Sequence, residues 1–203
     1  MTRREDVTGL VLAGGRGSRM GGVDKGLQLL DGKPLVQHAV ERLAPQVGPL
    51  LINANRHLDA YAAFGLPVVP DAEADFAGPL AGMLAALERC TTPWLATVPC
   101  DTPRFPRDLV ARLHAAALAQ GAEVVMPITT DETGAAQPQP VFCLLSRELR
   151  APLAAFLAGG QRRIERFTAG RRELRLAFAE HEAFFNANTP DELQRLQDLQ
   201  RGR

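Results

Sequence analysis

The stretch VTGLVLAGGRGSRMGGVDKG, residues 7–26, joins a short apolar run to a long glycine-rich segment. The apolar run Val7–Ala13 predicts a β-strand, because it is short, rich in branched residues and bounded by polar residues and glycines. The glycines that follow let successive backbone N–H groups converge on phosphate oxygens. Arg16, Arg19 and Lys25 add positive charge to the same segment. The stretch therefore predicts a loop that holds a nucleoside triphosphate at the end of a first strand.

Two common phosphate-binding motifs do not fit this segment. A Walker A loop needs a Lys followed by Ser or Thr, but Lys25 is followed by Gly26. A dinucleotide fingerprint that uses the two glycines around Arg16 needs Gly or Ala at position 20, where Met20 stands. Hydride-transfer chemistry is therefore not expected. A mobile surface loop is the plain alternative, and the three cations among the glycines argue against it.

Along the rest of the chain, short apolar runs alternate with stretches of helical periodicity. This alternation is typical of βαβ units around a mainly parallel sheet, so the predicted fold class is α/β. A chain of 203 residues without an internal repeat or a long linker predicts one domain over residues 1–203. The expected strands are Val7–Ala13, Pro49–Asn53, Pro67–Pro70, Trp94–Val98, Glu123–Pro127, Val141–Leu145 and Leu174–Phe178. The expected helices are Pro34–Val47, Pro79–Arg89, Arg107–Gln120, Glu148–Leu157, Arg162–Thr168 and Pro190–Leu199, with Thr129–Gln139 as an exposed loop.

The composition argues against several classes of partner. Lys plus Arg and Asp plus Glu both number 23, so the chain lacks the net positive field that attracts nucleic acid or anionic lipid. No apolar run approaches the roughly 20 residues that a membrane span needs. The three cysteines lack metal-site spacing and are an odd number, which favours a reducing cytoplasm over a disulfide framework. We therefore expect a cytoplasmic protein without a nucleic-acid or membrane partner.

Polar residues follow three of the expected strands. Asp101 follows Trp94–Val98, Asn53 ends the second strand, and Asp71 follows the third. Because the carboxyl ends of parallel strands meet at one edge of a sheet, these side chains are expected near the glycine-rich loop. One carboxylate beside a triphosphate is sufficient to hold Mg²⁺, since phosphate oxygens and waters complete the octahedron. Turn formation and helix capping are the plain alternatives for all three.

Two further motifs carry paired small or polar residues. Gly78 and Gly82 lie at the start of an expected helix, where they allow a flat ring or another chain segment to approach the backbone. Close packing of the helix on the sheet explains these glycines equally well. Asn186 and Asn188 are two residues apart and share a face in an extended segment. They either line a binding site or cap the last helix.

Taken together, these motifs resemble the molybdenum cofactor guanylyltransferases, which join guanosine monophosphate to molybdopterin. The pattern M-G-G-x-D-K with N-A-N-R and P-C-D-T-P is far more specific than the L-A-G-G segment alone. The matching residues span nearly the whole chain in order, whereas Asp131–Gln139 and the second half of the chain match less well. They are Leu12–Gly15, Arg19–Lys25, Gly32–Leu35, Asn53–Arg56, Gly78–Gly82, Pro99–Pro103 and Asn186–Pro190.

The resemblance implies a Rossmann-like, three-layer nucleotidyltransferase fold with Mg²⁺ as cofactor and GTP and molybdopterin as substrates. It also implies transient contact with other proteins of the same cofactor synthesis. By position, it places Gly15 and Gly82 where they favour guanine over cytosine, and Asn186 and Asn188 toward the pterin. It also implies that the nucleotide is contacted by Leu12, Ala13 and Gly14. It assigns the phosphates to Lys25, the nucleoside to Asn53 and Asp71, and the magnesium ion to Asp101.

The chemistry that follows is transfer of GMP to the terminal phosphate of molybdopterin, with release of pyrophosphate. Lys25 and Arg19 would neutralise the developing charge, together with magnesium on Asp101. A phosphate nucleophile is already ionised at neutral pH, so no histidine base is required. The nearest alternative is transfer from CTP to molybdopterin, or from a nucleoside triphosphate to a sugar phosphate. A non-catalytic nucleotide-sensing or pterin-carrying protein is a further alternative, against which the presence of both Lys25 and Asp101 argues.

Overall fold

The computed structural model describes residues 3–13, 24–72, 78–131, 133–187 and 189–201. The strands are β1 (Val7–Leu12), β2 (Leu29–Leu30), β3 (Lys33–Pro34), β4 (Leu50–Asn53), β5 (Val68–Val69), β6 (Trp94–Pro99), β7 (Val124–Thr130), β8 (Ala136–Pro138), β9 (Cys143–Ser146) and β10 (Glu173–Ala177). The α-helices are α1 (Leu35–Leu43), α2 (Leu58–Ala62), α3 (Pro79–Arg89), α4 (Leu109–Gln120), α5 (Arg150–Ala158), α6 (Ile164–Thr168) and α7 (Pro190–Arg201). Short 3-10 helices are η1 (Arg4–Asp6), η3 (Lys25–Leu27), η4 (Ala44–Gln46), η5 (Arg147–Leu149) and η6 (His181–Phe184).

The main sheet has the strand order β10-β7-β9-β6-β1-β4-β5, with β8 paired to β7. Strand β1 is parallel to both β4 and β6, β4 is parallel to β5, and β10 is parallel to β7. Only β9 and β8 run antiparallel to their neighbours within this sheet as described. The sheet is therefore mainly parallel, as the sequence predicts, and each of the seven expected strands is confirmed within a few residues.

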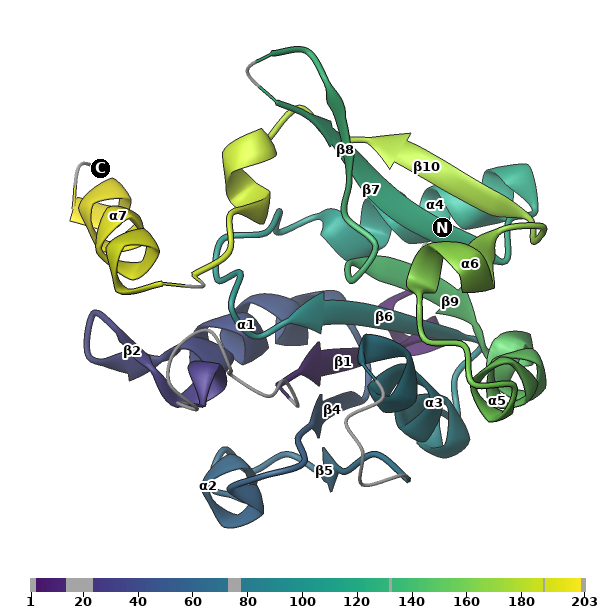
Figure 1. The fold of residues 1–203 in the computed structure, drawn as a ribbon, viewed down its shortest axis with the longest axis horizontal. Coiled ribbons are helices and arrows are strands. Elements are labelled where there is room, and N and C mark those ends of the chain that lie inside the picture. Colours follow the sequence, from purple (N-terminus) through teal and green to yellow (C-terminus); the bar gives the residue numbers. More distant parts are fainter. Residues whose placement is uncertain (1–2, 14–23, 73–77, 132, 188, 202–203) are drawn as a thin grey trace.

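Helices cover both faces of the sheet and make a three-layer α/β arrangement (Figure 1). One face packs against α1, α4 and η6, and the other against α3, α5 and α6. Strand β1 is buried along its whole length and alternates between the two faces: Val7 and Val11 join the first layer, Leu10 and Leu12 the second. An apolar run without polar alternation is what a central parallel strand requires, because neither face meets water.

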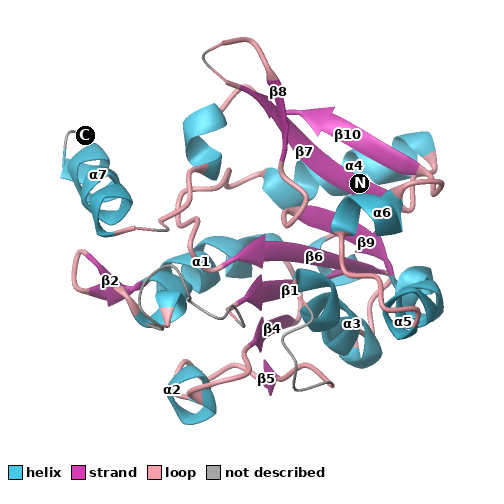
Figure 2. Ribbon diagram, in the orientation of Figure 1, coloured by secondary structure: helices cyan, strands magenta, loops and turns pink. Residues whose placement is uncertain are grey.

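The carboxyl ends of the central strands meet at a single edge of the sheet. Leu12 is in register with Asn53 on β4 and with Pro99 on β6, and Asn53 is in turn in register with Val69 on β5. In Figure 2 the arrowheads of β1, β4 and β6 accordingly point to the same side. The segments that follow these strands therefore begin close together, which is where ligands bind in open α/β sheets.

The expectation of an exposed loop over Thr129–Gln139 is wrong in part. Strand β7 runs on to Thr130, and β8 returns antiparallel to it with Ile128 opposite Pro138. Asp131 organises the turn, since its carboxylate accepts hydrogen bonds from both Thr133 and the backbone N–H of Ala135. The turn residues are polar, as expected, but backbone pairing continues almost to the tip.

The final helix packs away from the main sheet. Helix α7 begins after Thr189, whose hydroxyl accepts a hydrogen bond from the backbone N–H of Glu192 at 3.2 Å and so caps the helix. Its Leu196 is fully buried in a small cluster with Leu30 and Leu35, next to the β2–β3 hairpin. Burial of a leucine of this kind stabilises the docking by about 1.5–3 kcal/mol. In Figure 1, α7 lies beside this hairpin, at the ligand-facing end of the molecule.

All three cysteines are buried free thiols, so the chain contains no disulfide. Among the described residues, no helix combines the length and apolar character that crossing a membrane requires.

Candidate active site

Lys25 and Asp101 face each other at the carboxyl edge of the sheet. Cys100 N–H donates to the carbonyl oxygen of Leu12 at 3.0 Å, which extends the pairing of β1 and β6 by one residue and brings Asp101 beside the end of β1. Helix η3 begins at Lys25, which follows the glycine-rich segment in the sequence. Its Nζ lies 3.5 Å from Oδ2 of Asp101, and the two side chains are 22% and 15% exposed. The sequence-predicted pair is thus brought together by the fold.

Burial determines the electrostatics of Asp101. Loss of hydration raises the pKa of its carboxyl group above the ordinary value of 3.8, and the neighbouring Lys25 ammonium acts in the opposite direction. A cation placed beside such a desolvated carboxylate stabilises its ionised form. Burial also raises the pKa of the neighbouring Cys100 thiol well above its ordinary value, so this thiol stays neutral and is not a nucleophile.

A hydrogen-bonded network joins the ends of β4 and β5. The carboxylate of Asp71 accepts a hydrogen bond from Nδ2 of Asn53 and another from Nδ2 of Asn55, each at 2.8 Å. Asn55 Oδ1 accepts the backbone N–H of Asp71, also at 2.8 Å, and Asn53 donates to the carbonyl oxygen of Val69 at 2.9 Å. The predicted pair Asn53 and Asp71 is therefore in direct contact. Asn55 was not among the predicted site residues, although its spacing of two from Asn53 was a usable signal.

Gly82 lies on α3 directly against this network. A Cβ atom at Gly82 would be 2.3 Å from Oδ1 of Asn53 and 2.8 Å from Cδ2 of Leu12. No side chain fits there unless Asn53 moves. Ala13 closes the same corner, because its N–H donates to the carbonyl oxygen of Asn53 at 2.8 Å. Four predicted nucleotide-contacting residues thus form one tight cluster.

The segment before α7 is fastened to the Asp101 loop. The hydroxyl of the fully buried Thr102 donates to Oδ1 of Asn186 at 2.5 Å. The N–H of Ala187 donates to the carbonyl oxygen of Asp101 at 2.8 Å. The structure therefore brings Asn186 to the same edge as Asp101, across 84 intervening positions along the chain. Four other predicted residues, namely Gly14, Gly15, Arg19 and Asn188, lie outside the described residues.

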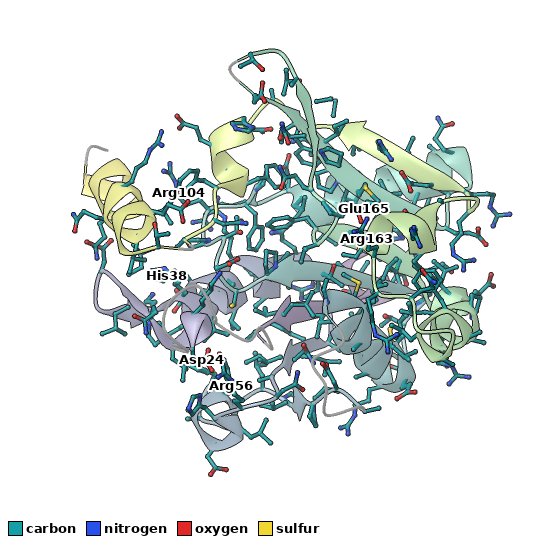
Figure 3. The ribbon with its side chains drawn as sticks, viewed as in Figure 1. Asp24, His38, Arg56, Arg104, Arg163 and Glu165 are labelled. Carbon is teal, nitrogen blue, oxygen red and sulfur yellow. The ribbon has the colours of Figure 1, made fainter. Side chains whose placement is uncertain are left out.

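A separate groove of about 930 Å³ runs between α1, the segment after β6 and η6. His38 and Arg104, both labelled in Figure 3, border it. None of the predicted site residues that the structure describes lines this groove. The described residues also contain no group of three or more His, Cys, Asp or Glu side chains able to hold a metal ion. The chemistry-bearing residues thus concentrate at the strand ends, around Lys25 and Asp101.

Comparison with known proteins identifies the family of this chain. The sequence model of the MobA-like NTP transferase domain matches residues 9–176. A protein of Cupriavidus necator named molybdenum cofactor guanylyltransferase is 57% identical over 193 residues, covering 95% of this chain and 97% of the relative. One of the same name from Methylibium petroleiphilum is 57% identical over 202 residues, covering 97% and 98% of the two chains.

Solved structures share the fold at much lower identity. A molybdopterin-guanine dinucleotide biosynthesis protein A from Archaeoglobus fulgidus has a TM-score of 0.79 at 21% identity, covering 97% of this chain and 100% of that one. The 4-diphosphocytidyl-2C-methyl-D-erythritol synthase of Anaerococcus prevotii has a TM-score of 0.75 at 10% identity, covering 98% and 97%. These likenesses establish the nucleotidyltransferase fold, and the sequence relatives establish the family. The chain belongs to the MobA-like NTP transferases and, among them, to the molybdenum cofactor guanylyltransferase family.

Proposed function

We propose that this protein transfers GMP from Mg²⁺-GTP to the terminal phosphate of molybdopterin, forming molybdopterin guanine dinucleotide and pyrophosphate. The observation that carries the proposal is the Lys25–Asp101 pair, 3.5 Å apart at the carboxyl edge of the sheet, in a chain of this family. A cation for phosphate oxygens and a carboxylate for a metal ion stand side by side there. A transfer between two phosphates needs these two groups and no general base.

In this reaction a terminal phosphate oxygen of molybdopterin attacks the α-phosphorus of GTP. A new P–O bond forms as the bond from the α-phosphorus to its bridging oxygen breaks, and pyrophosphate leaves with that electron pair. The Lys25 ammonium stabilises the negative charge that accumulates on the phosphate oxygens, and we assign Arg19 the same task. Positioning and charge stabilisation account for most of the rate enhancement in transfers of this kind.

Asp101 fits a magnesium ion. Its carboxylate is desolvated, has an elevated pKa and gains from an added cation, and carboxylate oxygen is the ligand type that Mg²⁺ prefers. Because no three-carboxylate cluster exists among the described residues, phosphate oxygens and waters would complete the coordination. When bound, Mg²⁺ supplies neutralisation of phosphate charge.

We assign the nucleotide and the pterin to opposite sides of the Lys25–Asp101 pair. Gly82 packs directly against the Asn53–Asp71 network, and we assign the nucleoside to the surface of this cluster, with Leu12, Ala13, Gly14 and Gly15 beside it. Asn186 and Asn188 are assigned to the pterin side. The chain would thus act as one domain over residues 1–203, whose N-terminal half binds GTP and whose C-terminal half approaches molybdopterin. The free thiols favour the cytoplasm as its location.

Nucleotide competition tests the choice of base. With molybdopterin, Mg²⁺ and equal concentrations of GTP and CTP, we expect the guanine dinucleotide to exceed the cytosine dinucleotide at least about tenfold, which corresponds to roughly 1.4 kcal/mol. Chromatography of the fluorescent pterin products measures the ratio. An excess of the cytosine product would make the protein a cytidylyltransferase, and equal amounts would show that it does not select guanine. Replacement of molybdopterin by a sugar phosphate should give no product.

Asp101→Asn should separate stability from activity. Because the folded-state pKa of Asp101 lies above its unfolded value, the ionised carboxylate costs the folded state free energy at pH 7. The amide removes this cost, so we expect Tm to rise at pH 7 while turnover is lost. The gain in Tm should shrink as the pH falls through the folded-state pKa toward 4, since the wild-type carboxyl group then protonates too. Thermal denaturation between pH 4 and pH 8 measures the difference in Tm between the variant and the wild type. A lower Tm for Asp101→Asn at pH 7 would contradict the cost that we attribute to the buried charge of Asp101.

A further inference from the structure

Asp24, immediately before Lys25, is buried and has three hydrogen-bond partners. It is only 9% exposed. Its Oδ1 accepts the backbone N–H of Gly26 at 3.1 Å and the phenolic hydroxyl of Tyr61 at 2.5 Å, and its Oδ2 lies 3.0 Å from Nδ1 of His57. In Figure 3 the Asp24 side chain lies beside the segment that leads into α2. One carboxylate therefore joins the turn that contains Lys25 to an element more than 30 positions further along the chain.

The two side-chain partners of Asp24 differ in burial, since Tyr61 is fully buried whereas the His57 side chain is 53% exposed. Tyr61 is fully buried in the core beneath α1 and the sheet. Its hydroxyl lies so close to Gly26 that a Cβ atom added there would be 2.4 Å from the phenolic oxygen. His57 has a left-handed backbone conformation, with φ of 50°, at the residue that precedes α2. The Lys25 turn thus packs against a buried tyrosine, and Gly26 has no room for a side chain on that side.

We propose that Asp24 is a positioning residue for Lys25: it fastens the turn 24–26 to Tyr61 and His57 and so holds the Lys25 ammonium over the phosphates. The proposal rests on the function proposed for Lys25. Lysine has a flexible four-carbon side chain, so the location of its ammonium depends on a fixed backbone origin and on its partner Asp101. Hydrogen bonds to a charged group are each worth about 1.5–3 kcal/mol, enough to fix a turn of three residues. Displacement of a catalytic group by about 1 Å costs up to about 10²-fold in rate.

A double-mutant cycle between Asp24 and Lys25 tests the proposal. Asp24→Asn keeps the shape of the side chain and removes its charge. We expect this substitution to lower kcat/KM for GTP by about 10- to 100-fold in the wild-type background, but by less than about 3-fold in a Lys25→Met background. In the Lys25→Met background the ammonium is absent, so a shift of the turn has no ammonium to displace. Equal losses in both backgrounds would mean that Asp24 supports the fold in general, and would overturn the proposal.

Calorimetric titration with Mg²⁺-GTP repeats the cycle without a pterin acceptor. The same non-additivity is expected in Kd. A wild-type protein that does not bind GTP would contradict the proposed function and this inference together, whereas binding with an additive cycle would contradict this inference alone. Asp59→Asn is the matched control, because it removes an exposed carboxylate from α2, and we expect a change of less than about twofold.

Two further variants keep the test decisive if Asp24→Asn folds poorly. Tyr61→Phe removes only the hydroxyl that donates to Asp24, and its smaller loss should also vanish in the Lys25→Met background. Gly26→Ala should be defective because its Cβ meets the Tyr61 hydroxyl at 2.4 Å. Combining Gly26→Ala with Tyr61→Phe removes the 2.4 Å contact and leaves only the ring carbons at 3.3 Å, so the double variant should be at least about fivefold more active than Gly26→Ala alone. Absence of this recovery would show that Tyr61 does not set the position of the turn.

Discussion

Lys25→Ala is expected to lower kcat/KM for GTP by about 10²- to 10³-fold, the effect of removing one preorganised charge partner from a transition state. The Lys25 ammonium lies 3.5 Å from Asp101 at the strand edge, where the phosphates are proposed to bind. Loss of the ammonium removes the positive charge that stabilises the phosphate oxygens, and it leaves Asp101 without its ion-pair partner. We expect kcat to fall more than KM rises, because charge accumulates mainly in the transition state. Steady-state measurement of pyrophosphate release gives both parameters.

Lys33→Ala is the matched control for this loss. Lys33 also forms an ion pair, with 2.7 Å between its Nζ and Oε2 of Glu41, but both side chains are exposed. An exposed pair is worth less than about 1 kcal/mol, so the control should retain its activity and nearly all of its stability. If Lys25→Ala were as active as Lys33→Ala, Lys25 would not be the phosphate-binding cation.

Gly82→Ala should be the most damaging single-methyl substitution at the nucleotide corner. In an ordinary helix, alanine is favoured over glycine by about 1 kcal/mol. Here the added Cβ would be 2.3 Å from Oδ1 of Asn53 and 2.8 Å from Leu12, so the predicted sign is reversed. Overpacking of this kind costs about 1–3 kcal/mol in the free energy of unfolding. Because Asn53 must shift together with its partner Asp71, we also expect kcat/KM for GTP to fall by about 10- to 100-fold.

Gly159→Ala is the control for the Gly82 substitution. Gly159 has an ordinary φ of −73°, and a Cβ added there would be in normal contact, 3.4 Å from the carbonyl oxygen of Phe156. This variant should match the wild type in urea unfolding and in turnover. A Gly82→Ala protein that is as stable and active as Gly159→Ala would show that the corner has room to spare, and would remove Gly82 from the nucleotide site.

Local sequence patterns predicted most of the main elements of this fold. Helix α3 occupies the expected residues Pro79–Arg89, because a proline starts it and one apolar face continues through it. Strand β1 was equally clear from its continuous apolar run. Several short elements were missed, including the β2–β3 hairpin and α2. Their sequences carry too few periods of a pattern, and tertiary contacts such as Leu30 with Leu196 hold the hairpin in place.

The candidate site was predictable where residues lie at strand ends and unpredictable where contacts cross the chain. Asp101 follows a buried strand, so its position at the ligand-facing edge followed from parallel topology. The antiparallel insertion of β9 between β6 and β7 was not foreseen, since an apolar run carries no sign of its direction. The hydrogen bonds of Asp24 to Tyr61 and His57 were likewise not predicted from the sequence. They depend on how the end of β4 leads into α2, which no local pattern encodes.

Transfer of a labelled phosphate tests the account most directly. The protein is incubated with Mg²⁺, molybdopterin and GTP labelled either at the α- or at the γ-phosphate. We expect the α-label in molybdopterin guanine dinucleotide and the γ-label in an equal amount of pyrophosphate, with neither product formed when molybdopterin is left out. Release of orthophosphate from the γ-position, or of the α-label as free GMP, would identify a nucleotide hydrolase and contradict the proposed transfer.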